Sequence, residues 1–310
     1  YGKIETQGIR CCYHGWLFDV EGHCLEMPAE ANPTGPQCQK VRQPWYPVEE
    51  RYGLVFAYLG PPEKKPVLPR YECLEVMAPG EFVEADDSSI GSGGIVIAPC
   101  NWLQHCENVV DPYHVPSLHG TFSGPQFVEQ MSASPKVKFE YGKTGVKATS
   151  LRPGPDGKRF RRVTEAVLPT LRVVPNPRVA QYGMVESIGW TVPIDDTHYR
   201  IYVAGRVKEK GELTKFKSRY AGGKTWAELT PEEHQRFPGD AEAQVGQGPI
   251  TFHSEEHLMS SDQGVSMLRI LLQKQVDIVA AGGDPAGVAF DEKDAYVKFD
   301  AGQFLDDTSA

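Results

Sequence analysis

The segment CNWLQHCENVVDPYHVPSLHG, residues 100–120, contains a carboxylate and two imidazoles at short spacing. Asp111, His114 and His119 follow the pattern D-x2-H-x4-H. Two neutral imidazoles and one carboxylate on one face of a metal form the facial triad that binds non-haem Fe(II) and leaves further coordination positions open. The spacing therefore predicts a mononuclear metal site with His114 and His119 among its ligands.

These residues are expected within one helix that extends from about Asn101 to His119. Residues three apart share a helix face, whereas residues five apart diverge by about 140° on an ideal α-helix. Pro116 lies between the two histidines and cannot donate a backbone hydrogen bond. We therefore expect a kink or a π-helical turn that brings both rings together. In a plainer alternative, Asp111 is an N-cap, Pro112 is the first helical residue, and the histidines are incidental.

A second group of metal-binding residue types is the segment CCYHGW, residues 11–16. It contains C-x-x-H, with Cys11 and His14, and the overlapping C-x-H, with Cys12 and His14. A structural zinc site would need two further ligands. The other nearby donors have unfavourable spacing for that purpose: His23, Cys24 and Cys38. A buried Cys/His pair without a metal is the remaining alternative.

The residues around this segment resemble a known family. The run YHGWLFDVEGHC, residues 13–24, with GLVFAYLG, residues 53–60, resembles the second half of a Rieske domain, where two Cys and two His bind a [2Fe–2S] cluster. Rieske domains carry C-x-H before C-x-x-H. By this resemblance Cys11 and His14 are the later pair, with Cys11 on the inner iron and His14 on the outer iron, and the second cysteine of the segment is not a ligand. The first pair is expected upstream of Tyr1, so we expect an N-terminally truncated Rieske domain with half of the cluster ligands.

The Rieske signature is followed about a hundred residues later by D-x2-H-x4-H. This combination resembles the oxygenase (alpha) subunit of the Rieske non-haem iron oxygenases over essentially the whole chain. The resemblance implies that His114 and His119 bind the mononuclear iron. It implies that Asp111 is a non-ligating bridge, hydrogen-bonded toward a ligand histidine and toward the cluster histidine of a neighbouring subunit. Asn108 is a further candidate for contact with the iron site.

The resemblance also implies a third iron ligand from a distant carboxylate. The segment FPGDAEAQVGQGPI, residues 237–250, resembles the PGD-x-EAQ segment of the phthalate-dioxygenase-like branch and indicates Asp240. Glu242 is the principal alternative. The other rivals are Glu255, Glu256 and Asp262, the last of which is a better candidate for a helix N-cap.

The activity implied by the resemblance is that of an oxidoreductase. It would use O2 and NAD(P)H-derived electrons to hydroxylate, dihydroxylate or oxidatively demethylate an aromatic, acid-like substrate in aromatic catabolism. The implied partners are an NAD(P)H-dependent reductase, with or without a ferredoxin, and further copies of the chain in a homotrimer or hexamer.

Two alternatives stay open. A stand-alone Rieske electron-transfer protein would leave D-x2-H-x4-H unexplained. A zinc hydrolase that uses His114 and His119 would lack H-E-x-x-H, because Val115 follows His114.

The elements that must position these residues follow from the hydropathy pattern. Short alternating segments punctuated by Gly and Pro predict strands at 9–19, 41–46 and 53–59. The proline-rich, charged segment 61–70 is the expected linker. Residues 86–94 are expected to be flexible, and the charged segment 208–239 is expected to be peripheral.

Beyond the linker, alternation across residues 137–207 predicts a larger sheet. Apolar residues at helical spacing predict a helix over 255–281 that ends at Gly282. The expected fold class is α+β. A truncated all-β Rieske domain, residues 1–62, precedes a catalytic domain, residues 63–310, with a helix-grip (START-like) antiparallel sheet and covering helices that hold the mononuclear iron.

Composition restricts the partners and the compartment. The 310 residues include 41 acidic and 32 basic side chains, a net charge of −9, which argues against a nucleic-acid or anionic-membrane surface. No apolar run approaches the roughly 18 residues that a membrane-spanning helix needs. Seven cysteines in a long chain without a secretory signature favour reduced thiols or metal ligands in a cytoplasm.

Overall fold

The computed structural model describes residues 1–86, 95–122, 124–213 and 223–307. It divides into two compact units, Tyr1–Pro66 and Val67–Ala310. The segment expected to be flexible lies outside the described residues from position 87 onward, as does part of the charged segment 208–239.

The first unit consists of short antiparallel strands. Four of them pair in chain order into one sheet: β1 (Gly2–Glu5), β2 (Gly8–Cys11), β3 (Leu17–Phe18) and β4 (Cys24–Glu26). A separate hairpin joins β5 (Val48–Arg51) to β6 (Leu54–Ala57). Its turn residues Tyr52 and Gly53 both have positive φ, at 57° and 75°, as a type I′ turn requires. A small core of Cys24, Met27 and Cys38 is covered by Trp16, Phe18 and Val41.

Two strand predictions in this unit are wrong. The expected strand 9–19 is interrupted, because residues 12–16 form a loop between β2 and β3. Residues 41–46 form no strand, and Arg42 makes only an isolated bridge to His23. Pro44 and Pro47 explain this result, since proline has no backbone N–H to donate to a sheet ladder.

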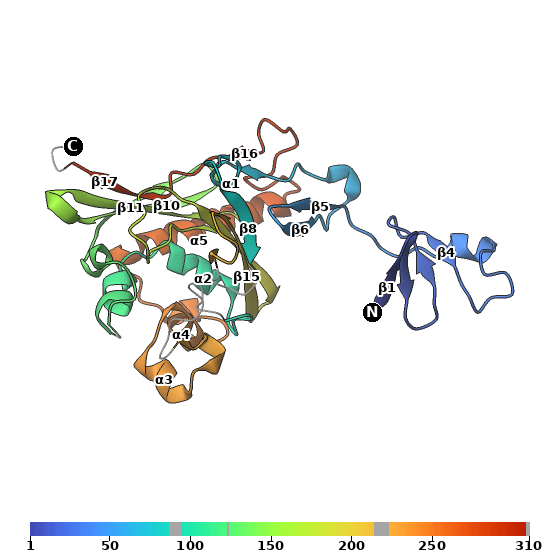
Figure 1. Ribbon diagram of the computed structural model, residues 1–310, viewed down its shortest axis with the longest axis horizontal. Coiled ribbons are helices and arrows are strands. Elements are labelled where there is room, and N and C mark those ends of the chain that lie inside the picture. Colours follow the sequence, from blue (N-terminus) through green and yellow to red (C-terminus); the bar gives the residue numbers. More distant parts are fainter. Residues whose placement is uncertain (87–94, 123, 214–222, 308–310) are drawn as a thin grey trace. The chain divides into compact units, whose positions relative to one another are not determined.

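The second unit is built on a nine-stranded antiparallel sheet, which confirms the strand prediction for residues 137–207 (Figure 1). Its main path runs β13-β17-β11-β12-β14-β15-β8, and β10 lies on the other edge of β11 with β9 beyond it. The strands are β8 (Phe82–Asp86), β9 (Lys136–Tyr141), β10 (Gly145–Pro153), β11 (Arg159–Val167), β12 (Leu171–Val173), β13 (Gly183–Met184), β14 (Ser187–Asp195), β15 (His198–Val207) and β17 (Gly302–Asp306). A parallel pair, β7 (Arg70–Tyr71) and β16 (Tyr296–Val297), lies outside this sheet.

Two helices cover the sheet. α2 (Trp102–Val109) and α5 (Gln263–Ala280) lie on the same side of it, as Figure 1 shows. They share one core with β10 and β11, made of Cys106, Val109, Val110, Val146, Ala166, Val265 and Leu268. The remaining α-helices are short: α1 (Glu72–Glu75), α3 (Pro231–Arg236) and α4 (Asp240–Gly246).

The C-terminal helix α5 begins eight residues later than the sequence predicted, at 263 instead of 255, because 3-10 turns occupy His253–Glu255 and Ser260–Asp262. Asp262 does precede the helix, but its side chain accepts from Met259 N instead of capping the helix. The predicted end is confirmed. Gly282 has φ of 83°, and its N–H donates to Val279 O.

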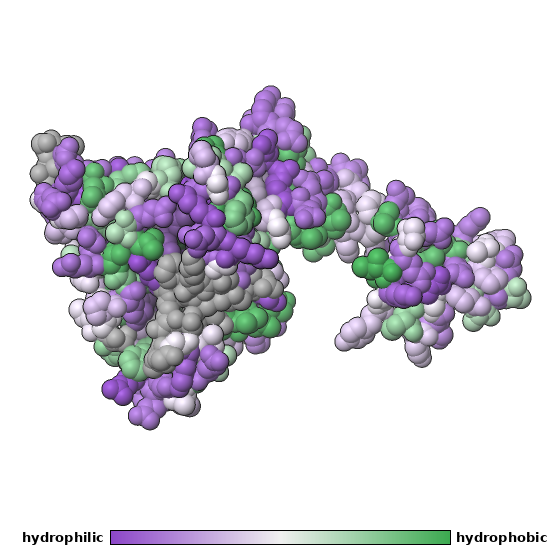
Figure 2. All heavy atoms as spheres, in the orientation of Figure 1, coloured by the Kyte–Doolittle hydropathy of each residue, from purple (hydrophilic) through white to green (hydrophobic). Residues whose placement is uncertain are grey.

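Within the described residues, no helix combines the length and the apolar character that crossing a bilayer requires. On the face drawn in Figure 2, hydrophilic residues cover much of the second unit, and apolar residues are interspersed among them.

Candidate metal centre

The segment with D-x2-H-x4-H forms two helices instead of the single helix expected. α2 ends at Val109, and a π-helix occupies Val115–Phe122. The break lies at Asp111, whose Oδ1 accepts hydrogen bonds from the backbone N–H of Tyr113 (2.9 Å) and His114 (3.4 Å). Asp111 therefore closes the turn that precedes the second helix, but Pro112 is not helical, so it is not the first helical residue that the plainer alternative expects.

The predicted π-helical turn is confirmed, and it brings the two histidines together. In a π-helix the hydrogen bond runs from residue i to residue i+5, so residues five apart come onto one face. The ring centroids of His114 and His119 are 5.3 Å apart, with the ring planes at 71°. His119 is 3% exposed. The histidines are thus not incidental, and the plainer alternative is wrong on this point as well.

Asp240 joins the two imidazoles from far along the chain. It is the first residue of α4, and its Oδ1 lies 3.0 Å from His119 Nε2 and 3.4 Å from His114 Nε2. One ligand atom from each of the three residues lies within 4.8 Å of the other two. Two ligand atoms at right angles about an ion, each about 2.1 Å from it, are themselves about 3 Å apart. The donor set and its spacing fit one ion with facial two-histidine, one-carboxylate ligation.

The charges at this site favour a cation. Burial lowers the pKa of His114, but contacts with Asp111 and Asp240 raise it to about 10. Burial raises the pKa of Asp240, whereas the charge of His119 and the hydrogen bonds of both imidazoles hold it well below its usual range. Asp111 Oδ2 lies 3.3 Å from His114 Nδ1, so a second carboxylate is close. With both imidazoles neutral, as metal binding requires, the two carboxylates carry two negative charges that a divalent ion would neutralise.

Neighbouring side chains orient the three candidate ligands. Asn108 Nδ2 donates to Asp240 Oδ1 at 3.0 Å, so Asn108 does contact the site. His119 Nδ1 lies 3.0 Å from Gln126 Oε1. Since an amide oxygen can only accept, this contact assigns the proton to Nδ1 and leaves Nε2 free to bind a metal. Phe127 stacks on the His119 ring at 4.1 Å. Sequence reasoning missed Gln126 and Phe127, because no motif or periodicity distinguishes them.

The rival carboxylates have other partners. Glu242 binds His234 Nδ1 (2.6 Å) and Gly239 N (2.8 Å). Glu256 pairs with Arg269. Asp262 accepts from a backbone N–H, and Glu255 is exposed at the surface. None of the four belongs to a group of potential metal ligands in the part of the chain that the structure describes.

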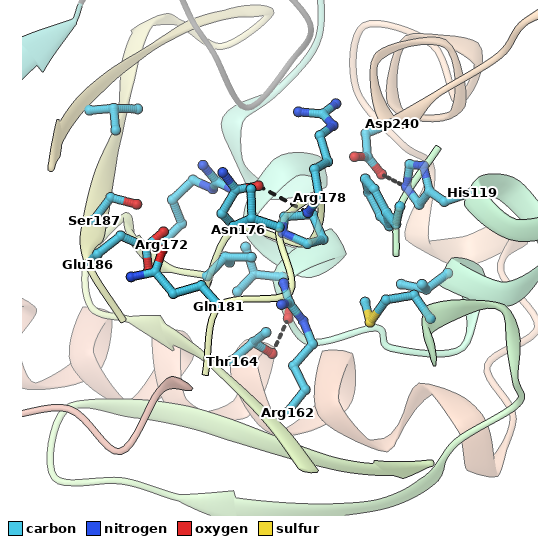
Figure 3. Close-up of a pocket in the computed structure, with 18 of the residues that line it drawn as sticks. His119, Arg162, Thr164, Arg172, Asn176, Arg178, Gln181, Glu186, Ser187 and Asp240 are labelled. Carbon is cyan, nitrogen blue, oxygen red and sulfur yellow. Dashed lines mark hydrogen bonds and ion pairs between the residues drawn. The ribbon is translucent and has the colours of Figure 1, made fainter. Parts of the chain in front are cut away.

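The candidate ligands border a cavity of about 650 Å³. Figure 3 shows His119 and Asp240 at one end of it, Glu186 and Ser187 at the other, and arginine and amide side chains between these ends. Apolar side chains also line the cavity, namely Phe127, Met131, Val174 and Val203. The polar lining includes Arg172, Asn176 and Gln181.

Of the other predicted metal ligands, Cys11 is the last residue of β2 and His14 lies on the loop between β2 and β3. The loop is closed by hydrogen bonds from Cys11 N to Trp16 O (2.8 Å) and from Gly15 N to Cys11 O (3.1 Å). Cys11 is partly exposed and His14 is exposed. Among the described residues no third His, Cys, Asp or Glu completes a metal-binding group with this pair.

Comparisons with known proteins identify the family of this chain. Residues 1–47 match the family of the Rieske [2Fe-2S] domain. The phenoxybenzoate dioxygenase alpha subunit of Ectopseudomonas oleovorans is 49% identical over 98% of this chain and 74% of its own length. This chain belongs to the Rieske non-haem iron oxygenases. The phthalate 4,5-dioxygenase oxygenase subunit of Pseudomonas putida is 28% identical over 93% of this chain and 71% of its own length.

Solved structures agree in fold. Dicamba monooxygenase bound to dicamba has a TM-score of 0.58 at 16% identity, over 90% of this chain and 83% of its own. The structure of NdmA of Pseudomonas putida CBB5 with caffeine also has a TM-score of 0.58. Its identity is 15%, over 91% of this chain and 76% of its own. The predicted fold class, a Rieske domain followed by an oxygenase catalytic domain, is confirmed.

Family membership also confirms the predicted enzyme class, an oxygenase among the oxidoreductases. It implies a [2Fe–2S] cluster and a mononuclear iron for this Rieske oxygenase. The two alternatives, a stand-alone Rieske carrier and a zinc hydrolase, find no support in these relatives, which match 90% or more of the chain.

Proposed function

We propose that this Rieske oxygenase uses O2 and externally supplied electrons to hydroxylate, dihydroxylate or oxidatively demethylate an aromatic, acid-like substrate. The observation that carries the proposal is the convergence of His114, His119 and Asp240 at one end of a cavity. Bound by these residues, ferrous iron would supply the open coordination positions and the redox chemistry that O2 activation needs.

The chain's own groups would keep that end of the cavity in place. Asn108 holds the carboxylate of Asp240, and Gln126 with Phe127 holds the ring of His119. Arg152 supports the break before the π-helix by donating to the carbonyl oxygen of Pro112 at 3.3 Å. These contacts fix the ligand directions before a metal arrives, which is the protein's part in an open metal site.

An acid-like substrate is supported by the arginines of the cavity. Arg152 donates to Ala133 O, and Arg162 donates to Pro175 O and Gln303 Oε1, so both guanidinium groups have structural partners. The buried Nε of Arg172 has no hydrogen-bond partner among the described residues. A buried donor without a partner is costly unless a ligand satisfies it, and guanidinium geometry suits a carboxylate. We propose that Arg172 binds the acid group of the substrate.

The size of the cavity supports an aromatic substrate. About 650 Å³ is within the range of small-molecule sites and would hold one or two rings. Phe127, Met131 and Val174 supply apolar surface for such rings. The names of the relatives add the classes that they act on, phenoxybenzoate and phthalate among them.

Residues 1–62 would receive the electrons and residues 63–310 would use them. In this proposal Cys11 and His14 are one ligand pair of the cluster, and Asp111 links the iron site to the cluster of a neighbouring subunit. An NAD(P)H-dependent reductase, with or without a ferredoxin, supplies the electrons, and the protein assembles as a homotrimer or hexamer. A cytoplasmic location suits the seven cysteines, all free thiols in this structure.

Oxygen consumption tests the proposal. Purified protein with a surrogate reductase and NADH should consume O2 when a suitable aromatic acid or methoxylated aromatic is added, and should release a hydroxylated or demethylated product. The Asp240→Ala variant is the control and should show neither. Product formation that survives in Asp240→Ala, or none with any aromatic tested, contradicts the proposal.

A further inference from the structure

α4, the helix that carries Asp240, is too short to be stable on its own. It contains seven residues, and isolated helices of this length do not persist in water. The position of Asp240 therefore depends on the contacts that α4 makes with the rest of the second unit.

The C-terminal end of α4 is bound to α2 by buried polar contacts. Gln104 Nε2 donates to the backbone oxygen of Gln244 (2.8 Å) and to that of Gly248 (3.1 Å). Gln104 is 4% exposed and Gln244 is 2% exposed. These contacts add a side-chain donor to two carbonyl groups at the end of α4.

The side chain of Gln244 is held from two further elements. Tyr199 of β15 donates its hydroxyl to Gln244 Oε1 at 2.7 Å, and His105 Nδ1 of α2 lies 3.2 Å from the same oxygen. Because the amide oxygen only accepts, Nδ1 of His105 carries the proton. Burial also lowers the pKa of His105 to about 3, so the imidazole is neutral and the network contains no charge.

The spacing of these residues connects the network to the metal ligand. Gln244 follows Asp240 by four residues, one helical turn, and on α2 Asn108 follows Gln104 by the same interval. Asn108 binds the side chain of Asp240 and Gln104 binds the backbone oxygen of Gln244, so two successive turns of α2 hold two successive turns of α4, while the Gln244 side chain adds the contacts with Tyr199 and His105. Gln244 itself is not among the residues that line the cavity described above.

We propose that Gln244 is a positioning residue for Asp240, which keeps the carboxylate where it can bind the metal. The proposal rests on the proposed metal site. Loss of Gln244 would let α4 shift relative to α2, and the metal affinity would fall although no ligand is changed. A residue that only stabilised the core would lower the melting temperature and leave the affinity of the folded protein unaltered.

Cobalt binding to protein that keeps its cluster but lacks the mononuclear metal separates these two roles. Co(II) is titrated by its visible absorption into wild type, Gln244→Leu and Gln247→Leu. Gln247 lies on the exposed side at the end of α4 and is the matched control. We expect at least a tenfold weaker Kd for Gln244→Leu and an unchanged Kd for Gln247→Leu. A Kd of Gln244→Leu within twofold of wild type overturns the proposal.

Two further variants complete the test. Tyr199→Phe keeps the ring and removes one hydrogen bond to Gln244, so it should weaken Co(II) binding by about fivefold even if Gln244→Leu fails to fold. An unchanged Kd in a folded Tyr199→Phe also counts against the proposal. Asp240→Ala should abolish binding. If Asp240→Ala binds Co(II) like wild type, the metal site itself is wrong, whereas failure of the Gln244 and Tyr199 variants alone removes only this inference.

Discussion

His119 Nε2 lies 3.0 Å from Asp240 Oδ1, although 121 residues separate the two in the sequence. The π-helix carries the imidazole, and α4, which follows β15 in the chain, carries the carboxylate. The metal site is thus a product of the whole second unit, and the unit must fold before the three ligands meet.

Asp240 and its sequence rival Glu242 give the first prediction. Asp240→Asn should remove the mononuclear iron, because the site loses its ligand carboxylate, and should leave the [2Fe–2S] signal intact. Glu242→Gln should keep the iron, because Glu242 binds His234 and Gly239 N instead of the site. Metal analysis measures the iron content of the two variants, and electron paramagnetic resonance measures their [2Fe–2S] signal. Iron retained in Asp240→Asn but lost in Glu242→Gln would reverse the assignment.

Asp111 should be needed for turnover more than for metal retention. Asp111→Asn keeps an oxygen that can accept from Tyr113 N, so the turn before the second helix and the iron content should persist. The charge beside His114 is lost, and we expect the rate of electron transfer from cluster to iron to fall about tenfold or more. Single-turnover kinetics measure this rate. A variant with full iron and an unchanged rate would disprove the bridging role.

Arg172→Gln should weaken the binding of an aromatic acid. A hydrogen bond to a charged group contributes about 1.5–3 kcal/mol, so KM should rise roughly 10- to 100-fold. Arg172→Lys, which keeps the charge, should recover part of this loss. The neutral methyl ester of the same acid is the control ligand, and its KM should not change. Equal effects of Arg172→Gln on acid and ester would refute a carboxylate contact.

The adjacent cysteines of the first unit provide a matched pair. Cys11→Ser should abolish the visible absorption of the [2Fe–2S] cluster, because serine is a poor substitute for a thiolate ligand. Cys12→Ser should keep it, because Cys12 is exposed and is not assigned as a ligand. Absorption and acid-labile sulfide measure the outcome, and loss of the cluster in Cys12→Ser alone would exchange their roles.

Glu256, another sequence rival, should affect stability and not iron. Its hydrogen bonds with Arg269 lower its pKa below 4.5. Its contribution to stability is therefore present above about pH 4.5 and is lost as the pH falls through the lowered value. Glu256→Gln should be less stable by about 1 kcal/mol at pH 7, and the difference should disappear in acid. Thermal melts across this range test it, and a constant difference would contradict it.

Local sequence information was sufficient for the motif and its unusual helix. Pro116 between two histidines indicated the π-helical turn, because a proline disrupts α-helical hydrogen bonding within a few residues of itself. The break at Asp111 was harder to predict, because the apolar spacing of residues 101–119 continues through it. Arg152 donates to the carbonyl oxygen of Pro112 at this break, a contact across 40 residues that local sequence does not show.

Long-range contacts account for what sequence reasoning missed. Gln126 and Gln244 are polar residues in segments without periodicity, and their roles come from partners on other elements. Asp240 was identified from a family resemblance and not from spacing. In the segment before the late start of α5, Glu256 likewise has a partner outside its own segment, Arg269 of the helix.

Metal stoichiometry of the purified protein tests the central claim most directly. Iron, zinc and acid-labile sulfide are measured together in wild type and in His119→Ala. We predict that wild type contains one iron atom per chain more than its sulfide accounts for, and that this excess iron is absent in His119→Ala. The account is contradicted if wild type contains equal amounts of iron and sulfide, or if it contains zinc in place of the excess iron. Either result would exclude a mononuclear iron held by His114, His119 and Asp240.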